Sequence, residues 1–329
     1  MDIDTLHTLL LICGGKGYER DVSLSGMKNI LPLIDEKRFR VISAEITKNG
    51  EWLTDGKIIL LTNGGIILDG ELVKIDCAFP LLHGDFGEDG RVQGALDCAD
   101  IPYIGCDAVS GAICRDKFVV KAVATSLNIP TLPSVLLTKG ENRQIAIAKI
   151  EKQIGYPAFV KPTSLGSSYG VSIAKCRRQL IHALKNALSF SDRVLVEKAL
   201  TDKRELECGF LSVKGKELFT NPGEIIIDGT YDYDKKYLPG VTKTKVNAEL
   251  DEKVTAKIKK YSKLLVQALG VRDFSRIDYF LSGEELYFNE INTIPGMTDT
   301  SLYPRMIEEA GVSFKEALNM LIEERILVE

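Results

Sequence analysis

The sequence predicts an α/β protein, and two observations support this fold class. Strand-like and helix-like segments alternate along the first hundred residues, which indicates a parallel, doubly wound sheet. Beyond residue 155 short strands return around a glycine- and serine-rich loop, which indicates further sheets. In the first part, strands are expected at residues 9–13, 39–46 and 77–82, and helices at 21–34 and 90–99.

The later elements are predicted from the same kind of pattern. Two helical pieces are expected within residues 108–127, and Ile129-Pro130 then breaks the helical pattern. These changes of pattern predict three domains, at residues 1–115, 116–205 and 206–329. Further helices are expected at 179–188, 253–269 and 313–326, and further strands at 156–161, 170–174, 193–198, 211–212, 224–227, 274–281 and 286–291.

Composition and charge narrow the class of protein. The 329 residues are 45% hydrophobic and 27% charged, as in ordinary soluble proteins, and the net charge of -4 argues against a nucleic-acid partner. No apolar run approaches the roughly 20 residues of a membrane span, and the first residues lack the basic segment of a signal peptide. Seven dispersed cysteines predict reduced thiols in a cytoplasmic protein, and three histidines argue against a zinc site.

Two predicted strands near the C-terminus carry polar side chains at alternate positions. Because side chains alternate across a strand, Arg276 and Asp278 share one face of the first strand, and Glu290 and Asn292 share one face of the second. Two carboxylates and an amide oxygen suit Mg²⁺, which takes oxygen ligands and shares them with substrate phosphates. A solvated strand face is the alternative, but the apolar neighbours and the Pro295-Gly296 turn favour a site.

The turn between these two strands leaves two registers open. A loop with an odd number of residues, centred on position 284, would pair Asp278 with Glu290, so that the polar side chains of both strands converge. A two-residue loop at Gly283-Glu284 would instead pair Asp278 with Asn289 and turn Glu290 to the opposite face.

A second segment has the pattern of a phosphate-covering loop. Lys161 ends a predicted strand, and the small residues over 163–170 would let backbone N–H groups approach phosphate oxygens. The segment is not a Walker A motif, because the lysine precedes the glycines. An ordinary hairpin loop is the alternative. Lys117 and Lys198 are further candidates, although each on its own fits a surface lysine.

Polar residues also follow the predicted strands of the first sheet. His83-Gly84 follows the third strand and Gly14-Gly15 follows the first, and open α/β sheets bind ligands at such carboxyl ends. The helix N-termini near Glu19 and near Glu88-Asp89-Gly90 can attract an anion such as a substrate carboxylate. A core histidine is the alternative for His83.

Together these motifs resemble those of ATP-grasp enzymes, and more closely those of D-alanine–D-alanine ligases. The resemblance covers nearly the whole chain, and it implies an ATP-grasp fold with an N-terminal Rossmann-like (pre-ATP-grasp) parallel-sheet domain. The three domains would then be a substrate domain, a central ATP-grasp small domain and a C-terminal catalytic and metal domain. In chain order the motifs are Gly14-Gly15…Glu19-Arg20-Asp21-Val22-Ser23-Leu24, His83-Gly84…Gly87-Glu88-Asp89-Gly90…Gln93-Gly94, Asp116-Lys117, Lys161-Pro162…Gly166-Ser167-Ser168…Gly170, Val196-Glu197-Lys198, Tyr231-Asp232-Tyr233…Lys236-Tyr237-Leu238, Arg276-Ile277-Asp278 and Asn289-Glu290-Ile291-Asn292-Thr293…Pro295-Gly296-Met297-Thr298.

The resemblance also implies roles for individual residues. Arg276 and the Gly296 N–H resemble an oxyanion hole, and residues 229–245 resemble a lid that excludes water. Glu19, Ser167 and Tyr237 resemble a hydrogen-bonded trio that joins the domains. Asp278, Glu290 and Asn292 resemble the ligands of two Mg²⁺ ions, with Mn²⁺ as the alternative ion. The residues implied in ATP binding are Lys117, Lys161, Gly166, Ser168, Glu197, Lys198, Leu200 and Glu205, and those implied in substrate binding are Glu19, His83, Lys236, Ser301 and Leu302.

The implied activity is ATP-dependent ligation of two D-alanine molecules through a D-alanyl phosphate, for peptidoglycan precursor synthesis. The resemblance further implies a cytoplasmic homodimer without nucleic-acid or membrane partners. A D-alanine–D-serine or D-alanine–D-lactate ligase is the alternative within the family, and another ATP-grasp carboxylate–amine ligase is the alternative outside it. Tyr237 and Leu302 favour D-alanine, whereas Thr300 stands where the family commonly has histidine, and Leu165 and Ala199 also depart from the family pattern.

A different class of protein is a further alternative, namely a nucleotide-binding regulator or a dinucleotide-binding oxidoreductase. Residues 14–17 read Gly-Gly-Lys-Gly and do not fit the Gly-x-Gly-x-x-Gly spacing of dinucleotide-binding folds. A protein that only binds a nucleotide would also not need all of Arg276, Asp278, Glu290 and Asn292.

Overall fold

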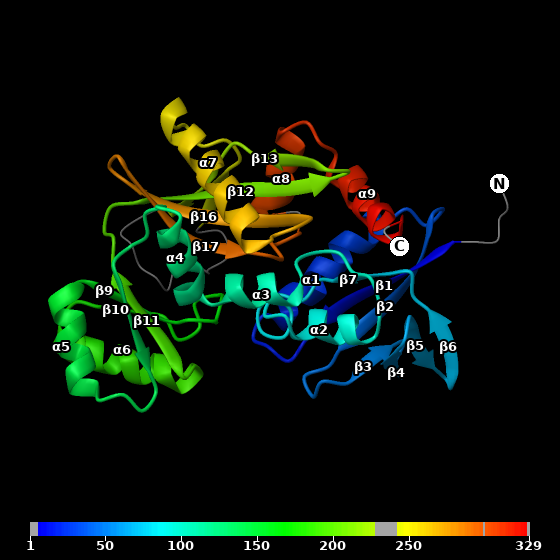
Figure 1. Ribbon diagram of the computed structural model, residues 1–329, viewed down its shortest axis with the longest axis horizontal. Helices are drawn as coiled ribbons and strands as arrows, with labels where there is room; N and C mark the ends of the chain where they lie inside the picture. Colours follow the sequence, from blue (N-terminus) through cyan, green and yellow to red (C-terminus); the bar gives the residue numbers. More distant parts are fainter. Residues whose placement is uncertain (1–5, 228–241, 299, 328–329) are drawn as a thin grey trace.

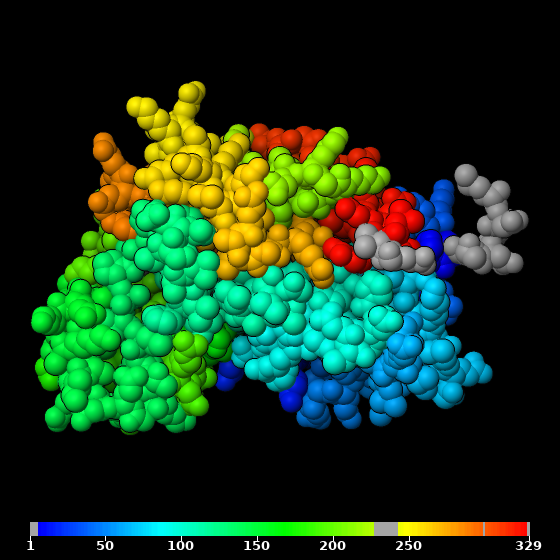
Figure 2. Space-filling view, viewed as in Figure 1, coloured from blue at the N-terminus to red at the C-terminus, as the bar shows by residue number. Residues whose placement is uncertain are grey.

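The computed structural model describes residues 6–227, 242–298 and 300–327, and in these ranges helices pack against three sheets (Figure 1). None of the helices within the described ranges is long and apolar enough to cross a membrane. The red C-terminal segment lies against the cyan segment that contains α2 and α3, so elements from distant parts of the sequence meet (Figure 2).

The first sheet has the strand order β6-β5-β4-β3-β2-β1-β7. In its parallel part, β1 (His7–Gly14) lies between β2 (Phe39–Ile46) and β7 (Cys77–Pro80). Residues 9–13 of β1 are fully buried, which explains why they form an unbroken apolar run. The prediction of a parallel sheet is confirmed for these strands.

The other strands of this sheet were not predicted from the sequence. They are antiparallel to one another, and Asp55-Gly56 and Asp69-Gly70 have the positive φ angles of type I′ hairpin turns. The sheet is therefore doubly wound only in its parallel part, because tight hairpins replace crossover helices in the rest. The added strands are β3 (Trp52–Thr54), β4 (Lys57–Thr62), β5 (Gly65–Leu68) and β6 (Glu71–Lys74).

Helices from both ends of the chain cover the first sheet. The C-terminal helix α9 (Phe314–Leu327) packs on β7, and its apolar side chains share one core with those of β1. This contact ties the C-terminal part of the chain to the first sheet. The other helices of this region are α1 (Arg20–Ile30), the 3-10 helix η1 (Leu31–Leu33), α2 (Arg91–Cys98) and α3 (Ala108–Arg115).

The central sheet has the order β10-β9-β11-β8, and its helices share one core with one of its faces. Val160 and Val196 point into this core, so the alternation of side chains turns Lys161 and Glu197 to the opposite face. That free face lines a cavity. The elements are β8 (Ser134–Thr138), α5 (Arg143–Gln153), β9 (Ala158–Pro162), β10 (Ser172–Ala174), α6 (Arg177–Phe190) and β11 (Arg193–Lys198).

The third sheet has the order β15-β14-β12-β16-β17, with β13 paired to β12. Helix α4 (Lys117–Ser126) packs on β17 and shares a core with helix α7 (Glu252–Leu269). Domain boundaries at 115 and 205 remain a prediction, and α4 belongs by its packing to the third sheet. The remaining elements are β12 (Arg204–Val213), β13 (Lys216–Phe219), β14 (Gly223–Ile227), β15 (Thr242–Lys245), β16 (Phe274–Ser282), β17 (Glu285–Asn292) and α8 (Leu302–Glu309).

Asp273 joins the first and third sheets just before β16. Its carboxylate accepts a hydrogen bond from the Gly105 N–H at 2.6 Å and two from Arg325 Nη2 at 2.8 and 2.9 Å. The residue has a φ of +63°, a left-handed conformation that Asp and Asn tolerate better than most residues. Gly105 lies between α2 and α3 and Arg325 lies in α9, so one carboxylate holds three distant segments together.

We expect Asp273→Asn to lower the free energy of unfolding by about 2 kcal/mol, because Asn keeps the left-handed backbone but loses the ion pair with Arg325. Urea unfolding followed by circular dichroism measures this change. Asp192→Asn is the matched control, since it alters the exposed pair of Asp192 with Lys139 and should have little effect. Equal effects of the two substitutions would contradict the role of Asp273.

Candidate active site

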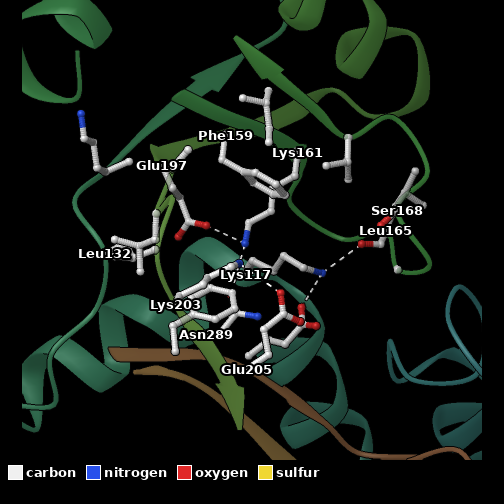
Figure 3. Close-up of a pocket in the computed structure, with 18 of the residues that line it drawn as sticks. Lys117, Leu132, Phe159, Lys161, Leu165, Ser168, Glu197, Lys203, Glu205 and Asn289 are labelled. Carbon is white, nitrogen blue, oxygen red and sulfur yellow. Dashed lines mark hydrogen bonds and ion pairs between the residues drawn. The ribbon is translucent and has the colours of Figure 1, made fainter. Parts of the chain in front are cut away.

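A cavity lies between the free face of the central sheet and the third sheet (Figure 3). Its charged lining comes from both sides and includes Lys117, Lys161 and Glu197. Apolar side chains complete it, as in sites that hold the flat ring of a nucleotide. The apolar residues are Leu132, Phe159, Leu165, Val171, Ile173, Ala199, Leu200 and Phe280.

A second cavity adjoins the first and extends to the first sheet. Glu19 and His83 line it from the N-terminal side, and Arg276 and Gly296 line it from the third sheet. The two cavities share Lys117, Gly166, Ser167, Glu205, Phe280, Asn289 and Glu290, so they form one continuous site. Residues that the sequence analysis selected from all three predicted domains thus line one space.

The strand pair β16–β17 combines features of both registers that the sequence left open. The loop has two residues, because Ser282 pairs with Glu285, yet Asp278 pairs with Glu290 and Arg276 with Asn292. A β-bulge at Asn289 reconciles these facts, since one extra residue in β17 shifts the register by one position. Glu290 therefore faces Asp278 although the loop is short, and Asn289 also lines the cavities.

Arg276 and Asp278 are paired residues that line the second cavity. Arg276 Nε and Nη2 donate to the two carboxylate oxygens of Asp278, each at 2.8 Å, and Nε lies 3.3 Å from Glu207 Oε1. Burial by itself would lower the pKa of Arg276, but Asp278 and Glu207 raise it, so the guanidinium stays charged. Asp278 also accepts from Asn292 Nδ2 at 3.0 Å.

Lys117 connects the third sheet to the predicted phosphate loop. Asp116 caps α4 by accepting from two backbone N–H groups, which fixes Lys117 as the first residue of the helix. Lys117 Nζ lies 3.2 Å from Glu290 Oε2 and donates to the Leu165 carbonyl at 2.9 Å. Burial by itself would raise the pKa of Glu290, but Lys117 and Lys161 hold it well below its usual range.

Glu197 lies between two buried lysines. One carboxylate oxygen contacts Lys121 Nζ, and the other lies 2.6 Å from Lys161 Nζ. Burial by itself would raise the pKa of Glu197, but the lysines outweigh it and lower the pKa to about 2. Burial lowers the pKa of Lys121 to about 8, although Glu197 opposes the shift.

The first sheet contributes an acidic and basic cluster to the second cavity. Glu19 Oε1 accepts from the Ser167 hydroxyl at 2.7 Å, and Glu19 Oε2 lies 3.3 Å from Arg115 Nη2. The predicted trio of Glu19, Ser167 and Tyr237 is thus present in its first two members, whereas Tyr237 and Lys236 lie outside the described residues.

His83 and Glu88 both contact Ile294, in the segment that follows β17. His83 Nδ1 lies 3.0 Å from the Ile294 carbonyl, and Glu88 Oε1 accepts from the Ile294 N–H at 3.1 Å. His83 is therefore both a buried, hydrogen-bonded histidine and a residue of the cavity wall. Because Gly296 follows two residues later, these contacts fix the backbone that presents its N–H.

Of the remaining predicted residues, Lys198 and Glu205 line the first cavity, whereas Ser301 and Leu302 are not among the residues that line either cavity. Lys198 Nζ donates to the Tyr156 carbonyl at 2.9 Å, and Glu205 Oε1 lies 3.2 Å from Lys203 Nζ. Ser301 Oγ accepts from the Thr298 N–H at 3.0 Å, in the turn beyond Gly296. Leu302 is buried at the start of α8 and packs close to Gly223.

Asp278, Glu290 and Asn292 fit a Mg²⁺ site by their chemistry. Within the described part of the chain, no group of three His, Cys, Asp or Glu side chains is placed to hold a metal ion. Two carboxylates and an amide leave an octahedral shell incomplete, as expected for an ion that shares substrate phosphates. A flip of the Asn292 amide, which now donates to Asp278, would turn its oxygen towards an ion.

Several residues of the site were missed by the sequence analysis. Glu207 faces Arg276, and its spacing from Glu205 on β12 was a usable signal, since alternate residues share a strand face. Lys121 lies one helical turn after Lys117, which was also a signal. Arg115 gave no signal, because its position depends on packing between segments that are distant in the sequence. Asn289 was considered only as the partner of Asp278 in the second register, and its place in the cavities depends on the bulge.

Comparisons with known proteins point to one family. The chain matches the family model described as the D-ala D-ala ligase C-terminus over residues 123–323, and the one described as the D-ala D-ala ligase N-terminus over residues 65–106. A D-alanine–D-alanine ligase of Streptococcus pneumoniae is 33% identical over 336 residues, which cover 96% of this chain and 95% of that protein.

Solved structures agree with this match. D-alanyl-alanine synthetase A of Vibrio cholerae has a TM-score of 0.91 and 34% identity, over 98% of this chain and 99% of that one. The VanG D-Ala:D-Ser ligase of Enterococcus faecalis has a TM-score of 0.89 and 30% identity, over 98% of this chain and 100% of that one.

Because the pKa of Glu197 is lowered, we expect the free energy of unfolding to decrease at acid pH. Because the folded pKa of about 2 lies below the usual 4.5, the folded state binds fewer protons, and its stabilisation is lost as the pH falls from about 4.5 towards 2. The shift corresponds to about 3 kcal/mol. Urea unfolding at pH 6, 4 and 3 should show a smaller loss on acidification for Glu197→Gln than for the unsubstituted protein, and equal losses would contradict the assignment.

Proposed function

The chain belongs to the D-alanine–D-alanine ligase family, and we propose that it joins two D-alanine molecules in an ATP-dependent reaction. The first D-alanine carboxylate attacks the γ-phosphorus of ATP, which gives D-alanyl phosphate and ADP. The amine of the second D-alanine then attacks the acyl carbon, and phosphate leaves as the dipeptide forms. The observation that carries this proposal is the continuous cavity in which Lys117, Lys161, Glu290 and Glu19 meet.

The nucleotide is proposed to lie between the central and third sheets. The apolar walls suit adenine, and Lys117 and Lys161 bring buried positive charge to the phosphates. The backbone of the loop over residues 163–170, with Gly166 and Ser168, can donate hydrogen bonds to phosphate oxygens. Further contacts proposed for ATP are Glu197, Lys198, Leu200 and Glu205, each of which lines this cavity.

Asp278, Glu290 and Asn292 would hold Mg²⁺, and we propose two ions by resemblance to the family. Bound Mg²⁺ neutralises charge on the phosphate oxygens. In the described structure, Lys117 pairs with Glu290, and Arg276 pairs with Asp278. An ion held by these carboxylates would leave Lys117 and Arg276 free to contact the reacting oxygens.

Arg276 and the Gly296 N–H would stabilise the oxyanion of the second step. Negative charge grows on the carbonyl oxygen as the tetrahedral centre forms, and fixed donors at that point lower the barrier. The contacts of His83 and Glu88 with Ile294 support this role, because they preorganise the backbone before Gly296. Glu19 would hold the ammonium group of the first D-alanine.

The second substrate is proposed to be D-alanine. Ser301 and Leu302 would receive its carboxylate with Lys236, and Tyr237 would complete the trio with Glu19 and Ser167. The same chemistry with D-serine is the alternative, because the similar VanG protein is named a D-Ala:D-Ser ligase. A homodimer in the cytoplasm that serves peptidoglycan precursor synthesis completes the proposal.

We expect phosphate release from Mg-ATP to depend on D-alanine and to be accompanied by a product with the mass of D-alanyl-D-alanine. Coupled phosphate detection and mass spectrometry of the same mixture test reaction and substrate together. An equimolar mixture of D-alanine and D-serine should still give mainly the D-alanine dipeptide. Absence of phosphate release with both amino acids would overturn the proposal.

We expect Glu290→Gln to lower D-alanine-dependent phosphate release by at least about a hundredfold, because the substitution removes a charged metal ligand and the partner of Lys117. Glu285→Gln on the same strand is the control, since Glu285 is exposed at the hairpin and should leave the rate unchanged. Comparable activity of the two variants would contradict the proposal that Glu290 is a metal ligand.

A further inference from the structure

Three aromatic rings join the first sheet's domain to the central domain beside the site. Tyr18, in the loop between β1 and α1, stacks on Tyr169 with ring centroids 4.5 Å apart and planes 27° from parallel. The ring of Phe190, at the end of α6, meets Tyr18 edge-on at 6.1 Å. Tyr18 thus packs on two rings of the central domain, in geometries that aromatic pairs prefer.

These rings sit next to the polar contact between the same two segments. Tyr18 precedes Glu19, and Tyr169 follows two residues after Ser167, whose hydroxyl donates to Glu19 at 2.7 Å. The aromatic and the polar contact therefore hold the same loop against the same segment of the first domain. The polar contact is part of the proposed catalytic trio, whereas the rings have no part in the chemistry described above.

The loop that carries Tyr169 needs outside support. Ser167 and Ser168 have φ angles of +48° and +60°, a left-handed conformation that costs a non-glycine residue energy. The base of the loop is held by Lys117 Nζ through the Leu165 carbonyl at 2.9 Å. Its tip is held by the Ser167–Glu19 contact and by the stack of Tyr169 on Tyr18.

Glycine at position 170 allows the rings to approach. A Cβ atom there would lie 2.9 Å from Pro162 Cγ and 3.0 Å from Phe190 Cδ2, and the residue has a φ of +70°. A side chain at this position would therefore displace Phe190, which packs on Tyr18.

We propose that Tyr18 and Tyr169 form an interdomain latch that keeps the phosphate loop closed over the site while the acyl phosphate exists. Both are positioning residues, because they act through Ser167 and Glu19. The proposal rests on the proposed function, since it concerns an intermediate of that reaction. The loop residues Gly166 and Ser167 line both cavities, so its closure covers the nucleotide and the first substrate together.

The chemical consequence of an open latch is loss of the intermediate to water. Water can attack the acyl carbon of D-alanyl phosphate, which releases phosphate and a proton and returns free D-alanine without forming the new C–N bond. ATP is then consumed without dipeptide formation. Exclusion of water from a reactive intermediate is a general reason for closed loops in enzymes.

The test compares phosphate release with dipeptide formation in Tyr18→Ala, Tyr169→Ala and the double variant. Released phosphate and dipeptide should be equal for the unsubstituted enzyme, whereas phosphate should exceed dipeptide about threefold or more in each variant, and the KM for ATP should rise by about threefold to tenfold. The double variant should be no worse than the worse single variant, because either truncation removes the same stack.

Matched controls separate the latch from a general loss of structure. Tyr18→Phe and Tyr169→Phe keep the rings and should keep equal phosphate and dipeptide. Ile145→Ala removes an apolar side chain that is 69% exposed on α5 and should change neither quantity. The thermal midpoint of the Tyr18→Ala variant should match that of the unsubstituted enzyme, because the Tyr18 side chain is largely exposed.

The outcomes distinguish this proposal from the proposed function. An unsubstituted enzyme without D-alanine-dependent phosphate release refutes the function, and the latch with it. An active, unsubstituted enzyme whose alanine variants keep equal phosphate and dipeptide and an unchanged KM for ATP overturns the latch alone. Excess phosphate in the alanine variants but not in the phenylalanine variants supports it.

Discussion

The ion pair between Lys117 and Glu290 joins the parts of the molecule on which the site depends. Lys117 begins α4, Glu290 lies on β17, and the same lysine holds the Leu165 carbonyl of the phosphate loop. A buried charge is costly without a partner, so each of these segments is fixed by the need to satisfy the others.

The need to pair each buried charge with one of opposite sign applies to other residues of the site as well. Glu197 is held between Lys121 and Lys161, and Arg276 between Asp278 and Glu207. In the proposed reaction, ATP and its metal ions enter this set of charges as both anions and cations. These pairs already hold the charged side chains at the cavity in the absence of substrates, as a preorganised site requires.

Geometry at the edge of the third sheet depends on a single extra residue. The bulge at Asn289 lets a tight two-residue hairpin coexist with a register in which Glu290 faces Asp278. It also allows Asn289 to line the cavities, where its side chain lies 3.4 Å from Lys161 Nζ. Bulges beside active sites are a common means of re-aiming side chains, and here one aims two consecutive residues at the same space.

Local periodicity and motifs were enough to predict the alternation of strands and helices, the apolar core of β1 and many of the polar residues that line the two cavities. The sequence left open the register of β16 and β17, since pairing depends on the loop and on any bulge, and neither is encoded by alternation. The hairpins over residues 52–74 were missed although Asp55-Gly56 and Asp69-Gly70 signalled them. The contacts of Arg115 with Glu19, of Lys121 with Glu197 and of Tyr18 with Tyr169 could not be predicted. They join segments that are distant in the sequence, and the relative positions of these segments are set by packing rather than by local sequence.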